Sequence, residues 1–397
     1  MPNERRILIW MCVLVGANQL GFGGVMPALP LYAQSFGVSV SAIGMAIALY
    51  GLARFCSAAP SGLIADRFGR RHALVLGALI TSAGNFWCAF AATYPEFVAA
   101  RFASGFGAGM IITAGQIVLA DISTPERRGR MMAIYQGTFI FAVGIGPYPG
   151  GWLAEHYGLT APFVSYGVLG IVTAIVACFA VGETREHARA RMPTGPRPSL
   201  ATQFGLLIRQ HGFVLIGLIA LANAITRTGG LFSIIPLLAS VRLGLSVSDI
   251  GLGLALGSLI GLVVVYPSGM LVDYFGRKSV IAPSSVIAGL SILLFCLADT
   301  HAAFIGACLV WGVASSIGGS APAAYAADSA PPGMNAATMS MYRMAGDAGY
   351  VAGPIILGLI ADLYSPETAL YLGAALLVCA GSGFAWFAPE THRNRGG

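Results

Sequence analysis

The sequence contains GLIADRFGRR at residues 62–71 and a second copy of this stretch, GMLVDYFGRK, at residues 269–278. The same shift of 207 residues superposes GVSVSAIG (37–44) on GLSVSDIG (244–251). Other residue pairs that keep this offset are Asp121 and Asp328, Tyr135 and Tyr342, Pro147 and Pro354, and Glu183 and Glu390. Chance does not preserve one offset over so many separate landmarks, so the chain consists of two homologous halves.

The composition around these copies is that of a membrane protein. Hydrophobic residues make up 56% of the chain and charged residues 10%, whereas about a quarter of the residues of a soluble domain are charged. The mean hydropathy is +0.77. A helix that spans a bilayer needs about 20 mostly apolar residues. The sequence has twelve such runs, at residues 7–32, 42–64, 73–92, 95–119, 131–153, 161–182, 211–237, 249–271, 279–298, 302–325, 338–360 and 367–388.

The runs divide evenly between the two halves. An even number of spans gives both halves the same orientation, related by a pseudo-two-fold axis along the membrane normal, and places a binding site between them near the midplane. We therefore expect an all-α membrane protein with twelve transmembrane helices in two six-helix bundles, residues 1–184 and 204–397. The stretch 185–203 is rich in Arg and Pro and lacks apolar periodicity, which predicts a cytoplasmic linker.

The distribution of positive charge predicts the orientation. With both termini inside, most of the 22 arginines and lysines lie in cytoplasmic segments, and Arg242 alone lies in an outer loop. The positive-inside rule thus predicts cytoplasmic termini in a cell membrane, and we expect a bacterial inner membrane. The first run ends in Pro27 and Pro30 without an Ala-x-Ala site, which predicts a retained helix rather than a cleaved signal peptide. The net charge of +6 reflects this asymmetry, and we expect no nucleic-acid partner.

The patterns of common enzyme and metal sites are absent from the sequence. It has no Walker sequence Gly-x-x-x-x-Gly-Lys-Ser/Thr, and its single lysine is Lys278. No nucleophile elbow occurs, and the seven cysteines lie inside apolar runs without a CxxC pair. We expect no catalytic residue, no metal site and no cofactor.

The repeated loop resembles the signature loop of the major facilitator superfamily of secondary transporters. This resemblance implies that the aspartate and arginine of the loop form a gating network with an acid at the end of the fourth span. Asp66, Arg70 and Asp121 occupy those positions, and Asp273 and Arg277 repeat the first two. The alternative is a basic loop that only sets the topology.

Two other stretches resemble motifs of the same superfamily. RFASGFGAG (101–109) in the fourth run is similar to its second motif, which implies a role in proton transfer for Arg101. GIGPYPGG (144–151) in the fifth run is similar to a signature of the twelve-span drug:proton antiporters, although Ala133 and Ala142 stand where that pattern has glycines. Such a stretch is expected to kink a helix, and the alternative is a kink without bearing on transport direction. The kink residues are Gly146, Pro147, Gly150 and Gly151.

Away from their ends, the apolar runs contain five charged residues: Arg54, Arg101, Arg227, Arg343 and Asp347. Charges in a membrane are costly, so such residues are functional candidates. Asp347 follows Arg343 by four residues, which places both on one face of a helix. Asp347 is either a proton carrier coupled with Arg343 or half of a static ion pair. The excess of arginine disfavours a cationic substrate and favours neutral, zwitterionic or anionic amphiphiles.

The resemblance also implies that the first, fourth, seventh and tenth spans line a cavity, with contributions from the fifth and eleventh. The candidate substrate-binding residues are Asn18, Gln19, Phe22, Arg54, Gln116, Tyr135, Gln136, Asn223, Arg227, Trp311 and Tyr342. The sequence thus predicts a monomeric, proton-coupled exporter of small amphipathic molecules, driven by the proton gradient. A proton-coupled uptake symporter for a small metabolite and a non-transporting membrane sensor are the alternatives.

Overall fold

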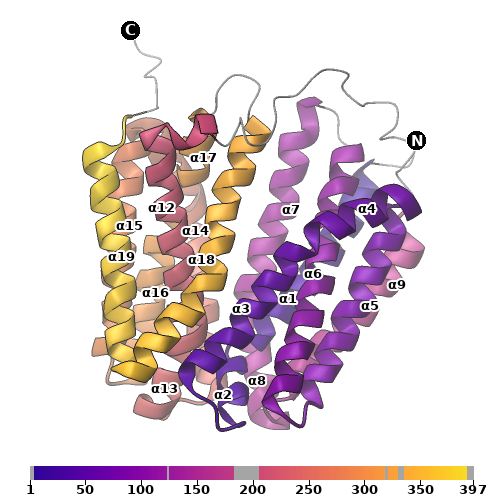
Figure 1. Cartoon of the computed structure of the whole chain (residues 1–397), viewed down its shortest axis with the longest axis horizontal. Helices are drawn as coiled ribbons and strands as arrows, with labels where there is room; N and C mark the ends of the chain where they lie inside the picture. Colours follow the sequence, from indigo (N-terminus) through magenta and orange to yellow (C-terminus); the bar gives the residue numbers. More distant parts are fainter. Residues whose placement is uncertain (1–3, 123–124, 183–204, 318–320, 330–334, 391–397) are drawn as a thin grey trace. The chain divides into compact units, whose positions relative to one another are not determined.

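The computed structural model describes residues 4–122, 125–182, 205–317, 321–329 and 335–390 (Figure 1). The described residues are almost entirely helical and include no β-strand. They cluster into two compact units. The first unit falls within Met1–Val38, Met45–Gly195 and Ser246–Ala255, and the second within Ser39–Gly44, Pro196–Leu245 and Leu256–Gly397. The expected linker, residues 185–203, lies outside the described residues.

The helices of the N-terminal half are α1 (Glu4–Val25), α2 (Leu29–Gln34), α3 (Val40–Cys56), α4 (Ala58–Phe68), α5 (Arg70–Ala89), α6 (Tyr94–Ile122), α7 (Pro125–Ile145), α8 (Pro147–Tyr157) and α9 (Ala161–Ala180). Those of the C-terminal half are α12 (His211–Ile225), η1 (Thr226–Ile234), α13 (Ile235–Leu243), α14 (Val247–Phe275), α15 (Arg277–Leu297), α16 (His301–Ile317), α17 (Ala321–Asp328), α18 (Asn335–Leu363) and α19 (Pro366–Phe387). In the part of the chain that the structure describes, each of the twelve apolar runs is covered by one helix or by consecutive helices.

The chain is a multi-span α-helical membrane protein. Within the described part of the chain, ten helical stretches are long and apolar enough to cross a membrane. Helix α3 and the segment Pro60–Phe68, bent by 41°, form an eleventh stretch as a broken pair. The expected fifth span, residues 131–153, consists of α7 and α8, which are separated at Gly146.

Small residues let the helices of the first unit approach closely. Helix α5 packs against α6 and α9, and α1 packs against α7 and α9. Gly107 of α6 lies against Gly77 and Thr81 of α5, while Gly109 lies against Arg54 of α3 and against Ser57, which lies between α3 and α4. The glycines of the stretch 101–109 thus act as helix-packing residues, as is common in membrane bundles.

In the second unit, α15 packs against α19, and α12 packs against α18. Ile216, Ile281, Tyr325 and Phe384 belong to one buried cluster at its core. A π-helical segment, η1, separates α12 from α13, and Pro236 follows it by two residues. Proline lacks a backbone N–H, and its ring disturbs the carbonyl four residues earlier, so it favours an altered hydrogen-bond register there.

Candidate functional site

The signature loop of the first unit assembles an ion-pair network, called here the Arg70 network. Gly69 joins α4 to α5 with φ of 108°, a conformation that side chains rarely adopt, and makes Arg70 the first residue of α5. Arg70 Nε donates to Asp121 Oδ2 at 2.9 Å, and Arg70 Nη1 donates to Asp66 Oδ1 at 2.9 Å. The structure therefore brings together the three residues that the sequence placed in a gate.

The two carboxylates of the Arg70 network differ in their surroundings. The side chains of Arg70 and Asp121 are 6% and 9% exposed, whereas that of Asp66 is 72% exposed. Arg70 Nη1 also donates to the carbonyl of Ala65 at 2.9 Å. A desolvated pair is costly to separate, while an exposed pair exchanges readily with water. Asp121 is thus the main partner of Arg70.

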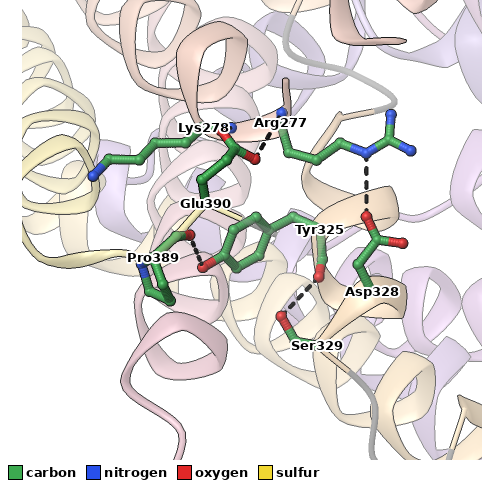
Figure 2. A network of polar contacts seen from close by, with 7 residues as sticks. All are labelled: Arg277, Lys278, Tyr325, Asp328, Ser329, Pro389 and Glu390. Carbon is green, nitrogen blue, oxygen red and sulfur yellow. Dashed lines mark hydrogen bonds and ion pairs between the residues drawn. The ribbon is translucent and has the colours of Figure 1, made fainter. Parts of the chain in front are cut away.

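The second copy of the loop builds a related network in the second unit, shown in Figure 2. Gly276 has φ of 91°, and Arg277 begins α15. Arg277 Nε donates to Asp328 Oδ2 of α17 at 3.2 Å. Asp328 is the repeat equivalent of Asp121, although the sequence prediction did not include it in the gate. For Asp273 the structure describes only the backbone.

Glu390 is a further member of this second network that sequence reasoning missed (Figure 2). Its Oε1 accepts the backbone N–H of Arg277 at 3.1 Å, and its Oε2 accepts that of Lys278 at 3.0 Å. These N–H groups open α15 and have no partner within the helix, so the carboxylate stabilises the positive end of the helix dipole. The signal in the sequence is the pairing of Glu390 with Glu183, which lies outside the described residues.

A buried polar group of residues, called here the Arg101 cluster, lies inside the first unit. Its members come from α1, α3, α6 and α9: Asn18, Gln19, Phe22, Tyr50, Arg101 and Tyr166. The guanidinium carbon of Arg101 lies 4.2 Å from the ring centroid of Tyr50, and Phe22 stacks on Tyr50 with centroids 5.2 Å apart. The sequence predicted Arg101, Asn18, Gln19 and Phe22 as separate candidates. It gave no signal for Tyr50 and Tyr166, because aromatic residues are ordinary in apolar spans.

Hydrogen bonds join most of the Arg101 cluster into one chain. The hydroxyls of Tyr50 and Tyr166 lie 3.2 Å apart, and the Tyr166 hydroxyl donates to Asn18 Oδ1 at 3.2 Å. Asn18 Nδ2 then donates to Gln19 Oε1 at 2.9 Å. Arg101 takes part through its contact with the Tyr50 ring rather than through a hydrogen bond.

Arg343 and Asp347 form the expected i, i+4 contact on α18. Arg343 Nε lies 3.8 Å from Asp347 Oδ2, which is an ion-pair distance rather than a hydrogen bond. The side chains are 56% and 29% exposed, so the carboxylate is partly accessible. This geometry is compatible with a proton carrier and with a static pair.

The remaining substrate-binding candidates are distributed over both units. In the first unit, Tyr135 is buried in the apolar core, Gln116 and Arg54 are half-buried, and Gln136 is exposed. In the second unit, Asn223, Trp311 and Tyr342 are half-buried, and Arg227 is exposed with its guanidinium 5.5 Å from the ring centroid of Phe232. These residues remain sequence predictions.

The kink residues coincide with a helix break and a close contact. Helix α7 ends at Ile145, and α8 begins at Pro147. Gly146 and Gly150 lie against the backbone of Gly23 and Gly24 of α1, where a Cβ on Gly150 would overlap Gly24. Their small size is therefore required for the packing of α1 against α8. Gly151, the remaining glycine of this stretch, is buried in α8.

Comparisons with known proteins agree on a family. A family model described as Major Facilitator Superfamily matches residues 11–264 and 218–397. An uncharacterized MFS-type transporter of Methanocaldococcus jannaschii is 24% identical over 356 residues, covering 90% of this chain and 91% of the relative. Quinolone resistance protein NorA of Staphylococcus aureus is 25% identical over 287 residues, covering 71% of each. The crystal structure of a D-xylose–proton symporter shares the fold, with a TM-score of 0.72, 18% identity, and coverage of 97% of this chain and 98% of the symporter.

Proposed function

The chain belongs to the Major Facilitator Superfamily, and from that premise we propose that it is a proton-coupled exporter of small amphipathic molecules. The observation that carries the proposal is the Arg70 network, in which one buried arginine is shared between a buried and an exposed carboxylate. Ion pairs of this kind can break and re-form, which suits a protein that alternates between two states. The Arg277–Asp328 pair provides a second such element.

Export, rather than uptake, is supported by the fifth-span motif and by one relative. The stretch 144–151, similar to an antiporter signature, lies where α7 and α8 meet. NorA, which shares 25% identity with this chain, is named for quinolone resistance. Removal of a drug from the cell is one way to confer resistance, and we extend that direction of transport to this chain.

Proton coupling is supported by Asp347. It is the only acid in the apolar runs of the sequence that lies away from their ends, and its carboxylate is partly exposed beside Arg343. A carboxylate that is neither fully solvated nor sealed by a hydrogen-bonded partner is suited to exchange protons. In this proposal Arg343 assists Asp347, and the proton gradient supplies the energy without a cofactor.

The proposed substrate is neutral, zwitterionic or anionic. Four arginines and one aspartate lie in the apolar runs away from their ends, so any cavity that they face favours negative over positive charge. The proposed setting is a bacterial inner membrane with both termini in the cytoplasm and the chain acting as a monomer.

Binding and transport by the full-length protein test this proposal in two steps. Thermal unfolding in detergent with a panel of neutral, zwitterionic, anionic and cationic amphiphiles identifies the compounds that raise the Tm. We expect compounds other than organic cations to do so, and stabilisation by organic cations alone would overturn the charge argument.

The compounds that stabilise the protein are then tested in everted membrane vesicles whose lumen is more acidic than the external buffer. We expect accumulation inside the vesicles that a protonophore abolishes, with vesicles lacking the protein as the control. Proton-driven accumulation only in right-side-out vesicles would identify an uptake symporter. Stabilisation without transport in either orientation would favour a sensor.

A further inference from the structure

The first unit contains a buried positive charge that has no hydrogen-bonding partner among the described residues. Arg101 is 0% exposed and is among the largest fully buried side chains. Its Nε, Nη1 and Nη2 atoms are all buried, and no described residue accepts a hydrogen bond from them. An arginine does not lose its proton in a protein, so this charge persists at every physiological pH.

The contact with Tyr50 compensates only a small part of this cost. A cation held 4.2 Å above a ring centroid gains about 2 kcal/mol when desolvated. Burial of an ion without a partner costs at least several kcal/mol. The guanidinium has five N–H groups that point outward in its own plane. The guanidinium lies over the face of the Tyr50 ring, and the ring accepts a hydrogen bond from none of these groups. The Arg101 cluster therefore lacks negative charge in the plane of the guanidinium.

The hydrogen bonds around Arg101 leave further donors in excess. Tyr166 donates to Asn18, so the hydroxyl contact between Tyr50 and Tyr166 is donated by Tyr50. Asn18 donates in turn to Gln19 Oε1, and Gln19 Nε2 is buried without an acceptor in the part of the chain that the structure describes. The chain of hydrogen bonds thus ends in an N–H donor.

A second arginine lies near Tyr50, and the same unit contains a buried neutral acceptor. Arg54 lies one helical turn from Tyr50 on α3 and adds positive potential on that side. Asn85 Oδ1 is a buried acceptor without a partner in the same unit, and Asn85 Nδ2 donates to Ser104 of α6 at 2.8 Å. The amide of Asn85 carries no charge and therefore cannot neutralise the guanidinium.

We propose that the Arg101 cluster is a binding site for a monovalent anion, with Arg101 as the charged ligand and Gln19 Nε2 as a neutral donor. The ion is either a free halide or the carboxylate of a small organic molecule, since both supply the negative charge and acceptor capacity that the cluster lacks. A planar carboxylate also matches the guanidinium fork. The site lies within the first unit and depends on neither the direction of transport nor proton coupling.

Binding of radiolabelled chloride to the purified full-length protein, measured by scintillation proximity, tests the proposal directly. We expect saturable binding that unlabelled chloride displaces and that Arg101→Met abolishes. Arg242→Gln serves as the matched control, because it removes an arginine that pairs with Asp299 at an exposed position, and it should bind chloride as the wild type does. Gln19→Leu should weaken binding several-fold.

Competition by formate and benzoate at constant ionic strength distinguishes the two sources of the anion. Displacement of chloride by both carboxylates, with benzoate the stronger competitor, would assign the site to an organic carboxylate. Failure of both to compete would assign it to a halide. Absence of saturable chloride binding to the wild type, together with a Tm that formate and benzoate leave unchanged, would overturn the proposal.

Thermal unfolding keeps the test valid if Arg101→Met folds poorly. At concentrations of added anion above its dissociation constant, the wild-type Tm should rise with the logarithm of that concentration. Arg101→Lys retains the charge but not the fork, so it should keep a weakened response. Equal rises in Tm of the wild type and Arg101→Lys with both formate and chloride would refute a role for the Arg101 guanidinium.

Discussion

Removal of the Asp121 carboxylate is expected to destabilise the protein far more than removal of the Asp66 carboxylate, although both contact Arg70 at 2.9 Å. The side chains of Arg70 and Asp121 are both under one-tenth exposed, while that of Asp66 is 72% exposed. Loss of one partner from a buried pair costs about 3–5 kcal/mol, because the remaining charge stays buried. An exposed pair contributes about 0–1 kcal/mol.

Two further substitutions are expected to give intermediate losses of stability. Asp121→Asn keeps an oxygen acceptor for Arg70 but replaces a hydrogen bond between two charged groups by one from a charged donor to a neutral acceptor, a loss of about 1–2 kcal/mol. Asp328→Ala removes the partner of Arg277 in the second network, where the side chains are 18% and 38% exposed and the distance is 3.2 Å. Its cost should fall between those of Asp121→Ala and Asp66→Ala.

Thermal unfolding of the purified full-length variants in one detergent, at one pH and ionic strength, measures the order of stability. The expected order of Tm is Asp66→Ala close to the wild type, then Asp328→Ala and Asp121→Asn, with Asp121→Ala lowest. A double-mutant cycle with Arg70→Ala isolates the interaction with Asp121. Equal loss of Tm in Asp66→Ala and Asp121→Ala would refute the assignment of Asp121 as the main partner.

Three other substitutions test separate parts of the structure. Gly150→Ala should lower the free energy of unfolding by about 1–3 kcal/mol, because the added Cβ overlaps Gly24. Gly137→Ala has no atom within 4 Å of the added Cβ and should leave the Tm unchanged or raise it. Equal effects of the two substitutions would contradict the packing role of Gly150. Glu390→Gln should lower the free energy of unfolding by about 0.3–1 kcal/mol, because it removes negative charge from the N-terminus of α15. Added salt should reduce the difference in Tm between this variant and the wild type. Asp347→Asn should abolish proton-driven transport while substrate still raises the Tm, and undiminished proton-driven transport would exclude Asp347 as the carrier.

The sequence predicts most of the helical architecture because the signals are strong and local. A run of about 20 apolar residues has few alternatives to a spanning helix. The Gly146–Pro147 step predicts a broken fifth span, and the structure separates α7 from α8 there. The π-helical segment η1 was not predicted, because its hydrogen-bond register depends on tertiary packing as well as on Pro236.

The repeat offset relates the two ion-pair networks of the candidate site. Arg70 and Asp121 were predicted as partners, and the same offset points to Arg277 and Asp328, which the structure joins at 3.2 Å. To predict that Glu390 caps α15, one must know where the chain runs after α19, and sequence spacing does not provide this. Likewise, the sequence marks Arg101 as a costly charge but cannot show whether a carboxylate faces it.

The proposal of proton-coupled export is tested most directly by reconstituted protein in liposomes loaded with a compound that raises its Tm. An acid external buffer imposes an inward proton gradient, and the release of the compound is followed together with the internal pH. Release that is faster with the gradient, that acidifies the lumen and that is lost in Asp347→Asn is the predicted result. Release that is unaffected by the gradient, or that leaves the internal pH unchanged, would contradict the proposal.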